Sequence, residues 1–234
     1  MPTAATNPDF GHRTRRPSSI LEFIRSNMPA VPAPSVPEIQ IHSAGPASGL
    51  RRLSKLDTEG RRPAPPYWAY SWPGGAALAR RFFDQPETVF GRRVLDLGAG
   101  SGIAAIAAAK CRAIEVIAAE IDPNAVVALR LNALANGVTI KIVAADITGG
   151  EPPAVDLVAV GDLFYDNDIA QRVIAFLDRC RAAGIDALIG DPGRAYLPHD
   201  RLRLVAEYRV RDIGDAKSAG LRTSRVFSYE PKGA

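Results

Sequence analysis

The chain has 234 residues, of which 47% are hydrophobic and 23% are charged, and its formal net charge is +4. This length accommodates one α/β domain with an extension and leaves little room for a second full domain. No stretch of about 18 apolar residues occurs, so the sequence predicts no membrane-spanning helix.

Residues 1–66 are predicted to form an N-terminal extension, because much of this segment is polar or rich in Pro, Gly and Arg. In chain order we first expect a short helix capped by Ser18 or Ser19 and ending near Met28. An extended Pro/Ala linker over Pro29–Pro37 and a short strand over Glu38–His42 should follow. The rest, to Pro66, should be a loop with one helical turn near Leu50–Leu56.

Residues 67–234 are predicted to form the main domain, in which strands and helices alternate from residue 93 to residue 190. This alternation predicts a mostly parallel sheet with helices on both faces. The expected helices are Ala76–Phe83, Ile103–Cys111, Pro123–Ala135 and Asp168–Arg181, and the expected strands are Arg93–Leu97, Glu115–Glu120, Ile140–Ala144, Val155–Val160 and Ala187–Ile189. The segments Val205–Val210 and Arg225–Tyr229 predict an antiparallel strand pair at the sheet edge.

A glycine-rich loop follows the strand Arg93–Leu97. It contains Gly98, Gly100 and Gly102 at alternate positions, shortly after Asp96. In open α/β sheets the ligand lies at the carboxyl ends of the strands, and glycines let it approach the backbone. Dinucleotide-binding loops have a different glycine spacing, and an acid beside the loop suits an ammonium group better than a phosphate. The pattern therefore predicts S-adenosylmethionine as cofactor.

Acidic residues also close the next two predicted strands. Glu120 can accept both ribose hydroxyls of the cofactor, whereas Asp122 can simply cap the following helix. Asp146 can accept the exocyclic amine of adenine while the backbone amide of Ile147 meets a ring nitrogen; helix capping is the alternative role for Asp146. Because acids recur at three successive strand ends, the set is more specific than any one member.

Residues 93–165 resemble the class I, seven-β-strand methyltransferases. That resemblance implies a Rossmann-like sheet of seven strands whose last hairpin is reversed. It also implies S-adenosylmethionine as cofactor. It does not specify which molecule accepts the methyl group.

Two segments bear on the methyl acceptor. Residues 66–75 contain both tryptophans, Trp68 and Trp72, and two tyrosines, one of them Tyr70. Aromatic rings can pack on a sulfonium or on an alkyl ammonium, and a hydrophobic plug between extension and sheet is the alternative interpretation. The second segment, residues 161–166, ends the fourth strand, where the acceptor lies in this architecture.

The Asp-Leu-Phe-Tyr sequence at residues 162–165 lacks the prolines found there in adenine and glutamine-amide methyltransferases. It resembles the family 16 protein-lysine methyltransferases. Together with residues 67–75 and 190–194, it is similar to the electron transfer flavoprotein β-subunit lysine methyltransferases over roughly residues 37–230. This resemblance implies that the protein partner is that flavoprotein subunit, methylated at lysines beside its recognition loop.

The acceptor lysine must react as a neutral amine, although its unperturbed pKa is about 10.4. We expect Asp162 to orient this lysine, with Tyr165 and Trp72 as walls that also adjoin the cofactor. Contact with the cofactor or bracing of the loop is the alternative role for Asp162. Further residues predicted to contact the substrate are Trp68, Tyr70, Phe164, Asp191 and Arg194. A simple turn is the alternative for Asp191 and Arg194.

Other functions stay open: methylation of a ribosomal protein, an RNA or a small molecule, or a non-catalytic scaffold that binds the cofactor. The basic residues are dispersed, so nucleic-acid binding is not expected. Two cysteines, Cys111 and Cys180, predict neither a disulfide framework nor a metal site. The protein is expected to be located in a reducing compartment, the cytoplasm, with the mitochondrial matrix as the alternative for a eukaryotic source. It is expected to be a monomer.

Overall fold

The computed structural model describes residues 19–50, 65–211 and 220–230. The main-domain strands are β3 (Arg93–Leu97), β4 (Glu115–Ala119), β5 (Lys141–Val143), β6 (Leu157–Gly161), β7 (Asp186–Asp191), β8 (Leu202–Arg211) and β9 (Leu221–Tyr229). The α-helices are α1 (Ile20–Asn27), α2 (Pro73–Asp84), α3 (Ile103–Lys110), α4 (Pro123–Ala135) and α5 (Asn167–Ala182). Short 3-10 helices are η2 (Tyr67–Ala69), η3 (Pro86–Thr88) and η4 (His199–Arg201).

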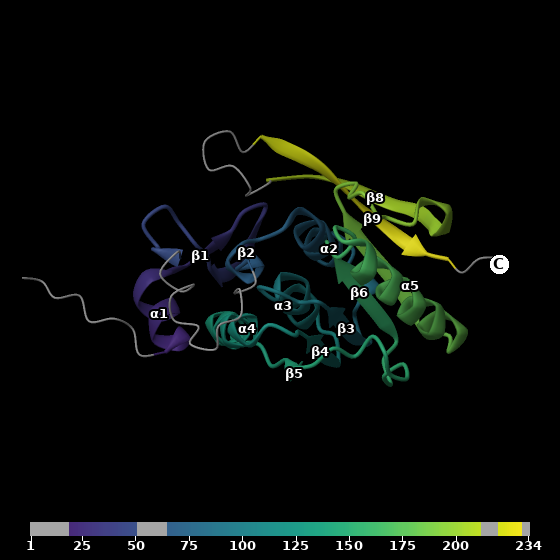
Figure 1. Cartoon of the computed structure of the whole chain (residues 1–234), viewed down its shortest axis with the longest axis horizontal. Helices are drawn as coiled ribbons and strands as arrows, with labels where there is room; N and C mark the ends of the chain where they lie inside the picture. The colour runs from purple at the N-terminus through teal and green to yellow at the C-terminus, as the bar shows by residue number, and fades with distance from the viewer. Residues whose placement is uncertain (1–18, 51–64, 212–219, 231–234) are drawn as a thin grey trace, which may run out of the picture.

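The seven strands form one sheet in the order β5-β4-β3-β6-β7-β9-β8 (Figure 1). The five strands from β5 to β7 are parallel, and β9 runs antiparallel to both of its neighbours. The predicted fold class and the antiparallel last pair are therefore confirmed. The predicted boundaries differ most at β9, which begins at Leu221 rather than at Arg225.

Helices pack on both faces of the sheet because its central strands are apolar on both faces. One buried cluster contains Leu78 and Phe82 of α2 together with Ile106 of α3. A second cluster, on the α5 side, contains Val173 and Phe176. Within the described part of the chain, no helix is both long and apolar enough to cross a membrane.

The predicted linker over Pro29–Pro37 is wrong, because most of it is paired as a hairpin. Strand β1 (Ala30–Ala33) pairs antiparallel with β2 (Val36–His42), and Ser35 adopts a left-handed φ of 67° between them. The helix α1 before it is confirmed, with Ser19 as its cap. The turn predicted near Leu50–Leu56 lies almost wholly outside the described residues.

Helix α4 holds this hairpin against the main domain. Asn136 Oδ1 accepts a hydrogen bond from the backbone N–H of Gln40 at 2.9 Å, and its Nδ2 donates to the Gln40 carbonyl at 2.6 Å. Asn132 Oδ1 accepts from the His42 N–H at 2.7 Å. Ile39 and Ile41 are buried in the core on this side. The N-terminal segment is thus packed onto the domain rather than separated from it.

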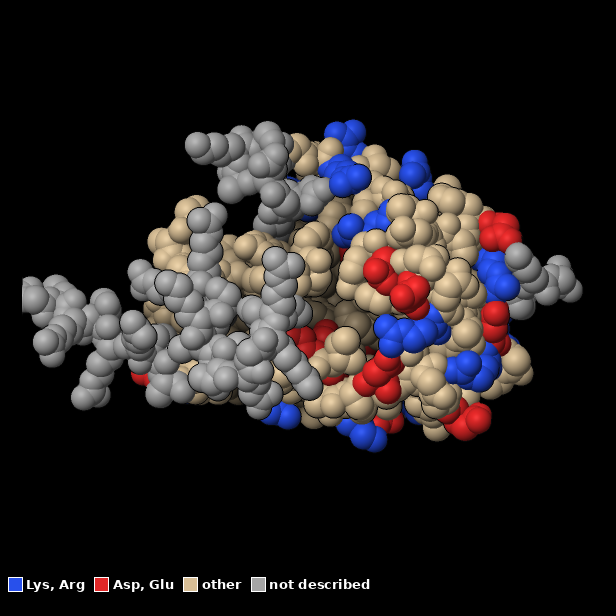
Figure 2. All heavy atoms as spheres, viewed as in Figure 1, with Lys and Arg blue, Asp and Glu red and all other residues tan. Residues whose placement is uncertain are grey.

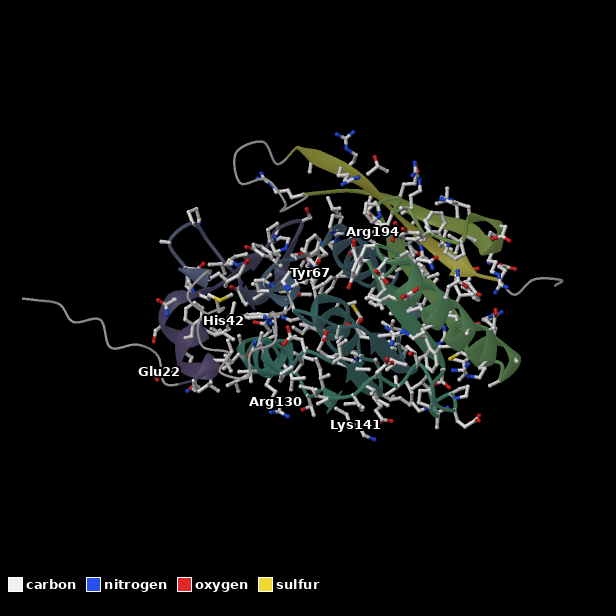
Figure 3. The ribbon with its side chains drawn as sticks, viewed as in Figure 1. Glu22, His42, Tyr67, Arg130, Lys141 and Arg194 are labelled. Carbon is white, nitrogen blue, oxygen red and sulfur yellow. The ribbon has the colours of Figure 1, made fainter. Side chains whose placement is uncertain are left out.

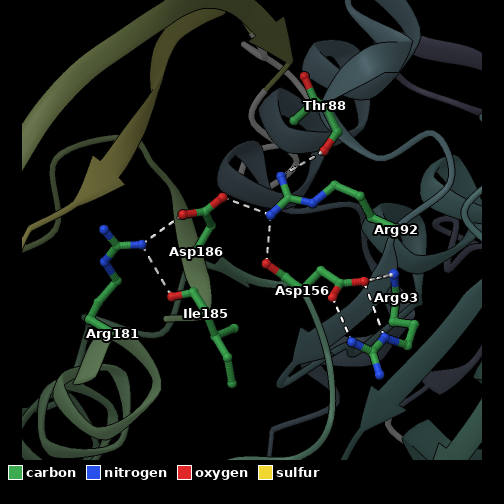
Figure 4. A network of polar contacts seen from close by, with 7 residues as sticks. All are labelled: Thr88, Arg92, Arg93, Asp156, Arg181, Ile185 and Asp186. Atoms are coloured by element: carbon green, nitrogen blue, oxygen red, sulfur yellow. Dashed lines mark hydrogen bonds and ion pairs between the residues drawn. The ribbon is translucent and has the colours of Figure 1, made fainter. Parts of the chain in front are cut away.

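Ion pairs join the amino ends of the central strands (Figure 4). Arg92 Nη2 donates to the Asp156 carbonyl at 2.6 Å and to Asp186 Oδ2 at 2.7 Å. Arg93 Nη2 pairs with Asp156 Oδ1 at 2.7 Å, and Arg181 Nη1 pairs with Asp186 Oδ1 at 2.7 Å. Solvent-exposed pairs such as these contribute little each. They lie at the edge opposite the glycine loop, so the predicted site does not include them.

Candidate functional site

Three glycines shape the loop between β3 and α3. Gly98, Gly100 and Gly102 have φ values of 69°, 53° and 80°, a region that side chains disfavour. A Cβ at Gly102 would overlap Leu129 Cδ1, whereas a Cβ at Gly100 would meet no protein atom within 4 Å. The left-handed φ and the contact with Leu129 therefore both favour glycine at position 102, while the space beside Gly100 lies open.

Glu120 braces the open part of this loop. Its Oε2 accepts from the N–H of Gly100 at 2.8 Å, and its Oε1 accepts from the N–H groups of Ile121 and Asp122 at 2.8 and 2.9 Å. An ionised carboxylate has about four acceptor positions. Three backbone donors leave about one of them, so the predicted contact with two ribose hydroxyls requires release of the Gly100 bond.

Asp96 is buried beneath the loop and caps α3. Its Oδ2 accepts from the N–H of Ala105 in the first helical turn at 2.9 Å, and the residue is 3% exposed. Burial raises the pKa of Asp96 to about 7, with a smaller contribution from the nearby Glu120 charge. The contact predicted between Asp96 and the ammonium of a cofactor stays a prediction.

Asp146 lies at the surface after β5. Its Oδ1 accepts from the N–H and the hydroxyl of Thr148 at 2.9 and 2.6 Å, and its Oδ2 pairs with Arg172 Nη1 at 2.7 Å. The hydrogen bonds from Thr148 are the main reason why the pKa of Asp146 is lowered. Ile147 packs against the core on the α5 side. An adenine amine would share Asp146 with Arg172.

Asp162, directly after β6, is held by four donors. Its Oδ2 accepts from the N–H groups of Gly74 and Gly75 at 2.6 and 3.0 Å, and its Oδ1 accepts from Arg194 Nε and Nη2 at 3.1 and 2.7 Å. Burial raises the pKa of Asp162 to about 6, although the Arg194 charge opposes this shift. These contacts support the bracing role, and orientation of a lysine stays a prediction.

Four glycines let the start of α2 lie directly on the ends of β6 and β7. A Cβ at Gly74 would overlap the carbonyl oxygen of Gly190, and a Cβ at Gly190 would overlap that of Gly74. A Cβ at Gly161 would lie 3.0 Å from the backbone of Gly75. These glycines were not predicted as site residues. Their occurrence at the start of a helix and at two strand ends was the available signal.

Aromatic rings surround the end of β6. Tyr67 lies 5.6 Å from Trp72 and 5.6 Å from Tyr165, measured between ring centroids. Tyr70 is 6.4 Å from Trp72, and the Arg194 guanidinium carbon is 5.5 Å from the Trp72 ring. Tyr67 and Arg194 lie near each other in Figure 3, in keeping with their shared neighbour Trp72. Tyr67 is 44% exposed and was missed as a site residue, although it lies within the predicted aromatic segment, residues 66–75.

Two predicted substrate contacts are wrong because the side chains are in the core. Trp68 is 2% exposed and packs with Phe23, Ile24 and Met28 near α4. It is the plug that the sequence allowed as the alternative. Phe164 is fully buried in the cluster beneath α5. The aromatic side chains that reach the surface beside Asp162 are therefore Tyr67, Trp72 and Tyr165, and the surface that they border is called here the acceptor opening.

The predicted substrate contact by Asp191 is also wrong, because Asp191 is fully buried. Its Oδ1 accepts from the N–H groups of Gly193 and Arg194 at 2.6 and 2.7 Å, which confirms the alternative of a turn. Its Oδ2 makes no hydrogen bond within the described residues. Arg194 is only partly exposed, and its side chain pairs with Asp162.

The space-filling view shows a hollow near the centre of the molecule, with acidic side chains on its border (Figure 2). Elsewhere on this face, basic and acidic side chains are interspersed. A nucleic-acid surface usually shows basic residues gathered on one face or along one helix. The charge on this face does not have that arrangement.

Comparison with known proteins identifies the family. An electron transfer flavoprotein beta subunit lysine methyltransferase from Xenopus laevis is 40% identical over 216 residues, which cover 89% of this chain and 86% of the relative. The protein of the same name from Rattus norvegicus is 40% identical over 71% of this chain and 68% of the relative. The chain belongs to the electron transfer flavoprotein β-subunit lysine methyltransferase family.

Broader comparisons agree with this assignment. The family model for ribosomal protein L11 methyltransferases matches residues 82–182, less than half of the chain. A solved structure of a proposed RNA methyltransferase from Pyrococcus horikoshii has a TM-score of 0.52 at 16% identity, covering 77% of this chain and 96% of that one. At such low identity the similarity shows the fold alone.

As a member of this methyltransferase family, the protein uses S-adenosylmethionine. Its own residues fit that cofactor. The open space beside Gly100 lets an adenosine approach the backbone, and Glu120 at the same edge retains acceptor capacity for a ribose hydroxyl. Asp96, Asp146 and Ile147 are the further residues predicted to hold it.

Proposed function

We propose that this methyltransferase modifies lysine side chains of a protein, and that its substrate is the electron transfer flavoprotein β subunit. The observation that carries this proposal is the 40% identity, over 89% of the chain, to a methyltransferase named for that substrate. The similarity extends beyond the cofactor-binding half, so it includes the segments that border the acceptor side.

The aromatic opening supports a lysine as acceptor. Tyr67, Trp72 and Tyr165 form a continuous set of ring contacts beside Asp162. The long alkyl chain of lysine can pack along such rings while its nitrogen extends inward. Contact with the rings also removes part of the water around the charged ammonium, which favours the neutral, reactive amine.

When bound, S-adenosylmethionine supplies a methyl carbon on a positively charged sulfur, which the lone pair of a neutral lysine nitrogen displaces. The chain contributes positioning. Asp162 holds the start of α2, which fixes Trp72 at the end of β6. The rings of Tyr67, Trp72 and Tyr165 shield one side of the bound lysine from water. Alignment and water exclusion account for the acceleration without a dedicated general base.

A ribosomal protein is the second candidate substrate, favoured by the match to the ribosomal protein L11 methyltransferase model. That match begins at residue 82 and leaves out Tyr67 and Trp72. It therefore supports the cofactor more than the acceptor.

The test is methylation of purified recombinant electron transfer flavoprotein, with ribosomal protein L11 as a parallel substrate. Intact-mass and peptide mass spectrometry should find methyl groups on lysines of the flavoprotein β subunit only when S-adenosylmethionine is present. Methylation of L11 alone would contradict the proposed substrate. If no lysine of either protein, or of any protein in a cell lysate, is modified, lysine methylation itself is contradicted.

A pair of variants checks the acceptor opening in the same assay. Tyr165→Phe keeps the ring that contacts Tyr67, whereas Tyr165→Ala removes it. We expect Tyr165→Ala to lower kcat/KM by roughly tenfold, because tyrosines are enriched among the few contact residues whose truncation costs over 1 kcal/mol. Equal activity of the Ala variant and the wild type would remove Tyr165 from the acceptor site.

A further inference from the structure

Arg194 brings a positive charge to the acceptor side of the site. Its Nε and Nη2 both donate to Asp162 Oδ1, at 3.1 and 2.7 Å, while its guanidinium carbon is 5.5 Å from the Trp72 ring. The Arg194 side chain is 23% exposed and that of Asp162 is 9% exposed. Because both side chains are mostly shielded from water, their charges are weakly screened. They therefore act strongly on each other and on a substrate side chain bound beside them.

The buried Asp191 determines where the Arg194 side chain points. Its Oδ1 accepts both the Gly193 and the Arg194 N–H, which closes a tight turn after β7. Gly193 allows this turn with a φ of 96°. The turn directs the Arg194 side chain toward Asp162 at the neighbouring strand end.

We propose that Arg194, aimed by Asp191, neutralises the Asp162 carboxylate beside the acceptor opening, so that the substrate lysine reacts as a neutral amine. This inference rests on the proposed lysine methylation. Asp162, Arg194 and Asp191 are here positioning residues, because they act through α2 and Trp72 and through their own charges rather than by exchanging a proton with the lysine.

The physical reason is the balance of charge around the amine. An uncompensated carboxylate stabilises an ammonium and raises the pKa of the lysine, whereas a paired carboxylate has little net effect, and a nearby cation lowers that pKa. The lysine proton passes to solvent as the side chain enters. The nitrogen lone pair then forms the bond to the methyl carbon, and the electrons of the broken C–S bond stay on sulfur.

Other titratable groups lie within electrostatic reach. Asp191 acts on Asp162, and His199 acts on Asp191. The groups that act on Tyr165, besides Arg194, are Tyr67, Asp166 and Glu120. Burial raises the pKa of Tyr165 above its usual range. The pKa of Asp162 is about 6, so this carboxylate is ionised in the range where lysines titrate. The Asp162–Arg194 pair is therefore the charge balance that variants can change most directly.

The test measures the single-turnover rate of methyl transfer against pH at saturating substrate, which reports ionisation in the bound complex. The wild-type rate should rise with pH as the lysine loses its proton. In Arg194→Gln this rise should move to higher pH by roughly one to two units, the shift that a neighbouring opposite charge produces. Arg194→Lys keeps the charge, so its rise should stay at the wild-type pH, at a lower plateau.

The double variant Asp162→Asn/Arg194→Gln removes both charges, and its rise should return toward the wild-type pH. Calorimetric titration with S-adenosylmethionine verifies that each variant is folded. The proposal is overturned if Arg194→Gln titrates like the wild type, or if Arg194→Lys shifts as far as Arg194→Gln. Where Arg194→Gln turns over too slowly to measure, the other two variants are compared with the wild type. A rise that moves to higher pH in either Arg194→Lys or the double variant then overturns the proposal. Inactivity of the wild type would instead contradict the proposed function.

Discussion

Gly100 and Gly102 of the cofactor loop have different roles. Gly102 packs against Leu129, whereas Gly100 borders open space, and alanine substitution can separate the two roles. At Gly102 a Cβ would overlap Leu129 and would also occupy a left-handed φ of 80°. We expect Gly102→Ala to lower the free energy of unfolding by roughly 2–5 kcal/mol, the sum of the left-handed cost and of displacing Leu129. Urea unfolding of the cofactor-free protein measures this loss.

Gly100→Ala is the matched control. Its Cβ would meet no protein atom, so only the left-handed cost of about 1–2 kcal/mol applies. The methyl group would extend into the space beside the loop, and S-adenosylmethionine should bind about tenfold or more weakly by calorimetry, an effect of over 1 kcal/mol. Equal stability losses in the two variants, with unchanged cofactor affinity at Gly100, would contradict this division of roles.

Asp162 has an unusual backbone conformation. It is not glycine, yet its φ is 73°. Asp tolerates this region better than most residues, and strained positions persist only where the surroundings hold them. The N–H groups of Gly74 and Gly75 and the Arg194 fork supply that restraint. Such a residue could be located at a strand end from the sequence, but its partners could not, because they are far from it along the chain.

At the scale of elements, Trp68 in η2 joins the N-terminal helix to the main domain. It is buried with Phe23 and Met28 on one side and residues of α4, among them Leu131, on the other. Trp68→Ala should therefore lower the free energy of unfolding by about 3–5 kcal/mol. Trp68→Phe, which keeps most of the apolar contact, should cost distinctly less.

Kinetics distinguish this packing role from substrate binding. Methylation by folded Trp68→Phe should have the wild-type KM for the protein substrate, because the side chain does not reach the opening. A KM raised severalfold together with unchanged unfolding would return Trp68 to the substrate site and overturn this assignment.

The central strands and helices were predictable because each carries its own local signal. The strand Arg93–Leu97 is an apolar run ended by glycines, and Pro123 and Ser19 mark helix starts. The hairpin β1–β2 was not predictable, because proline-rich segments rarely pair as strands. The hairpin is held by hydrogen bonds from Asn132 of α4 and from Asn136, which caps that helix. Long-range amide contacts of this kind leave no local pattern.

The candidate site was predictable to a similar degree. The acids lie at or just after the carboxyl ends of three parallel strands, as expected, since those ends meet at one edge of the sheet. Their contacts with the cofactor stay predictions. An aromatic side chain reaches the opening only if no helix packs over that side chain. Trp68 and Phe164 are covered by α1 and α5, whereas Tyr67 and Tyr165 are 44% and 42% exposed.

At the scale of the whole molecule, polar groups are distributed unequally between the two ends of the sheet. The amino ends of β3, β6 and β7 carry ion pairs at the surface, as Figure 4 shows. The carboxyl ends carry buried carboxylates, Asp96, Asp162 and Asp191. Burying a carboxylate costs stability unless it is paired. Asp162 is paired with Arg194, whereas Asp96 accepts only the Ala105 N–H among the residues that the structure describes, so Asp96 carries the largest such cost.

This arrangement predicts an unusual pH dependence of stability. Asp96 has a pKa of about 7 in the folded protein, against about 3.9 in an unfolded chain. Between these values the unfolded chain has lost the proton that the folded protein keeps. The Asp96 contribution to the free energy of unfolding therefore falls as pH rises from about 4 to about 7, and it changes no further above that.

Asp96→Asn isolates this effect, because the amide oxygen can still accept from the Ala105 N–H but does not ionise. Other titrating groups are common to both proteins and cancel in the difference. The stability of the wild type relative to Asp96→Asn, from urea unfolding without cofactor, should decrease by a few kcal/mol between about pH 4 and about pH 8. A difference that stays constant over this range would show that Asp96 ionises normally in the folded protein. The carboxylate would then be hydrated, and the cofactor loop would be open to water rather than closed over a buried acid.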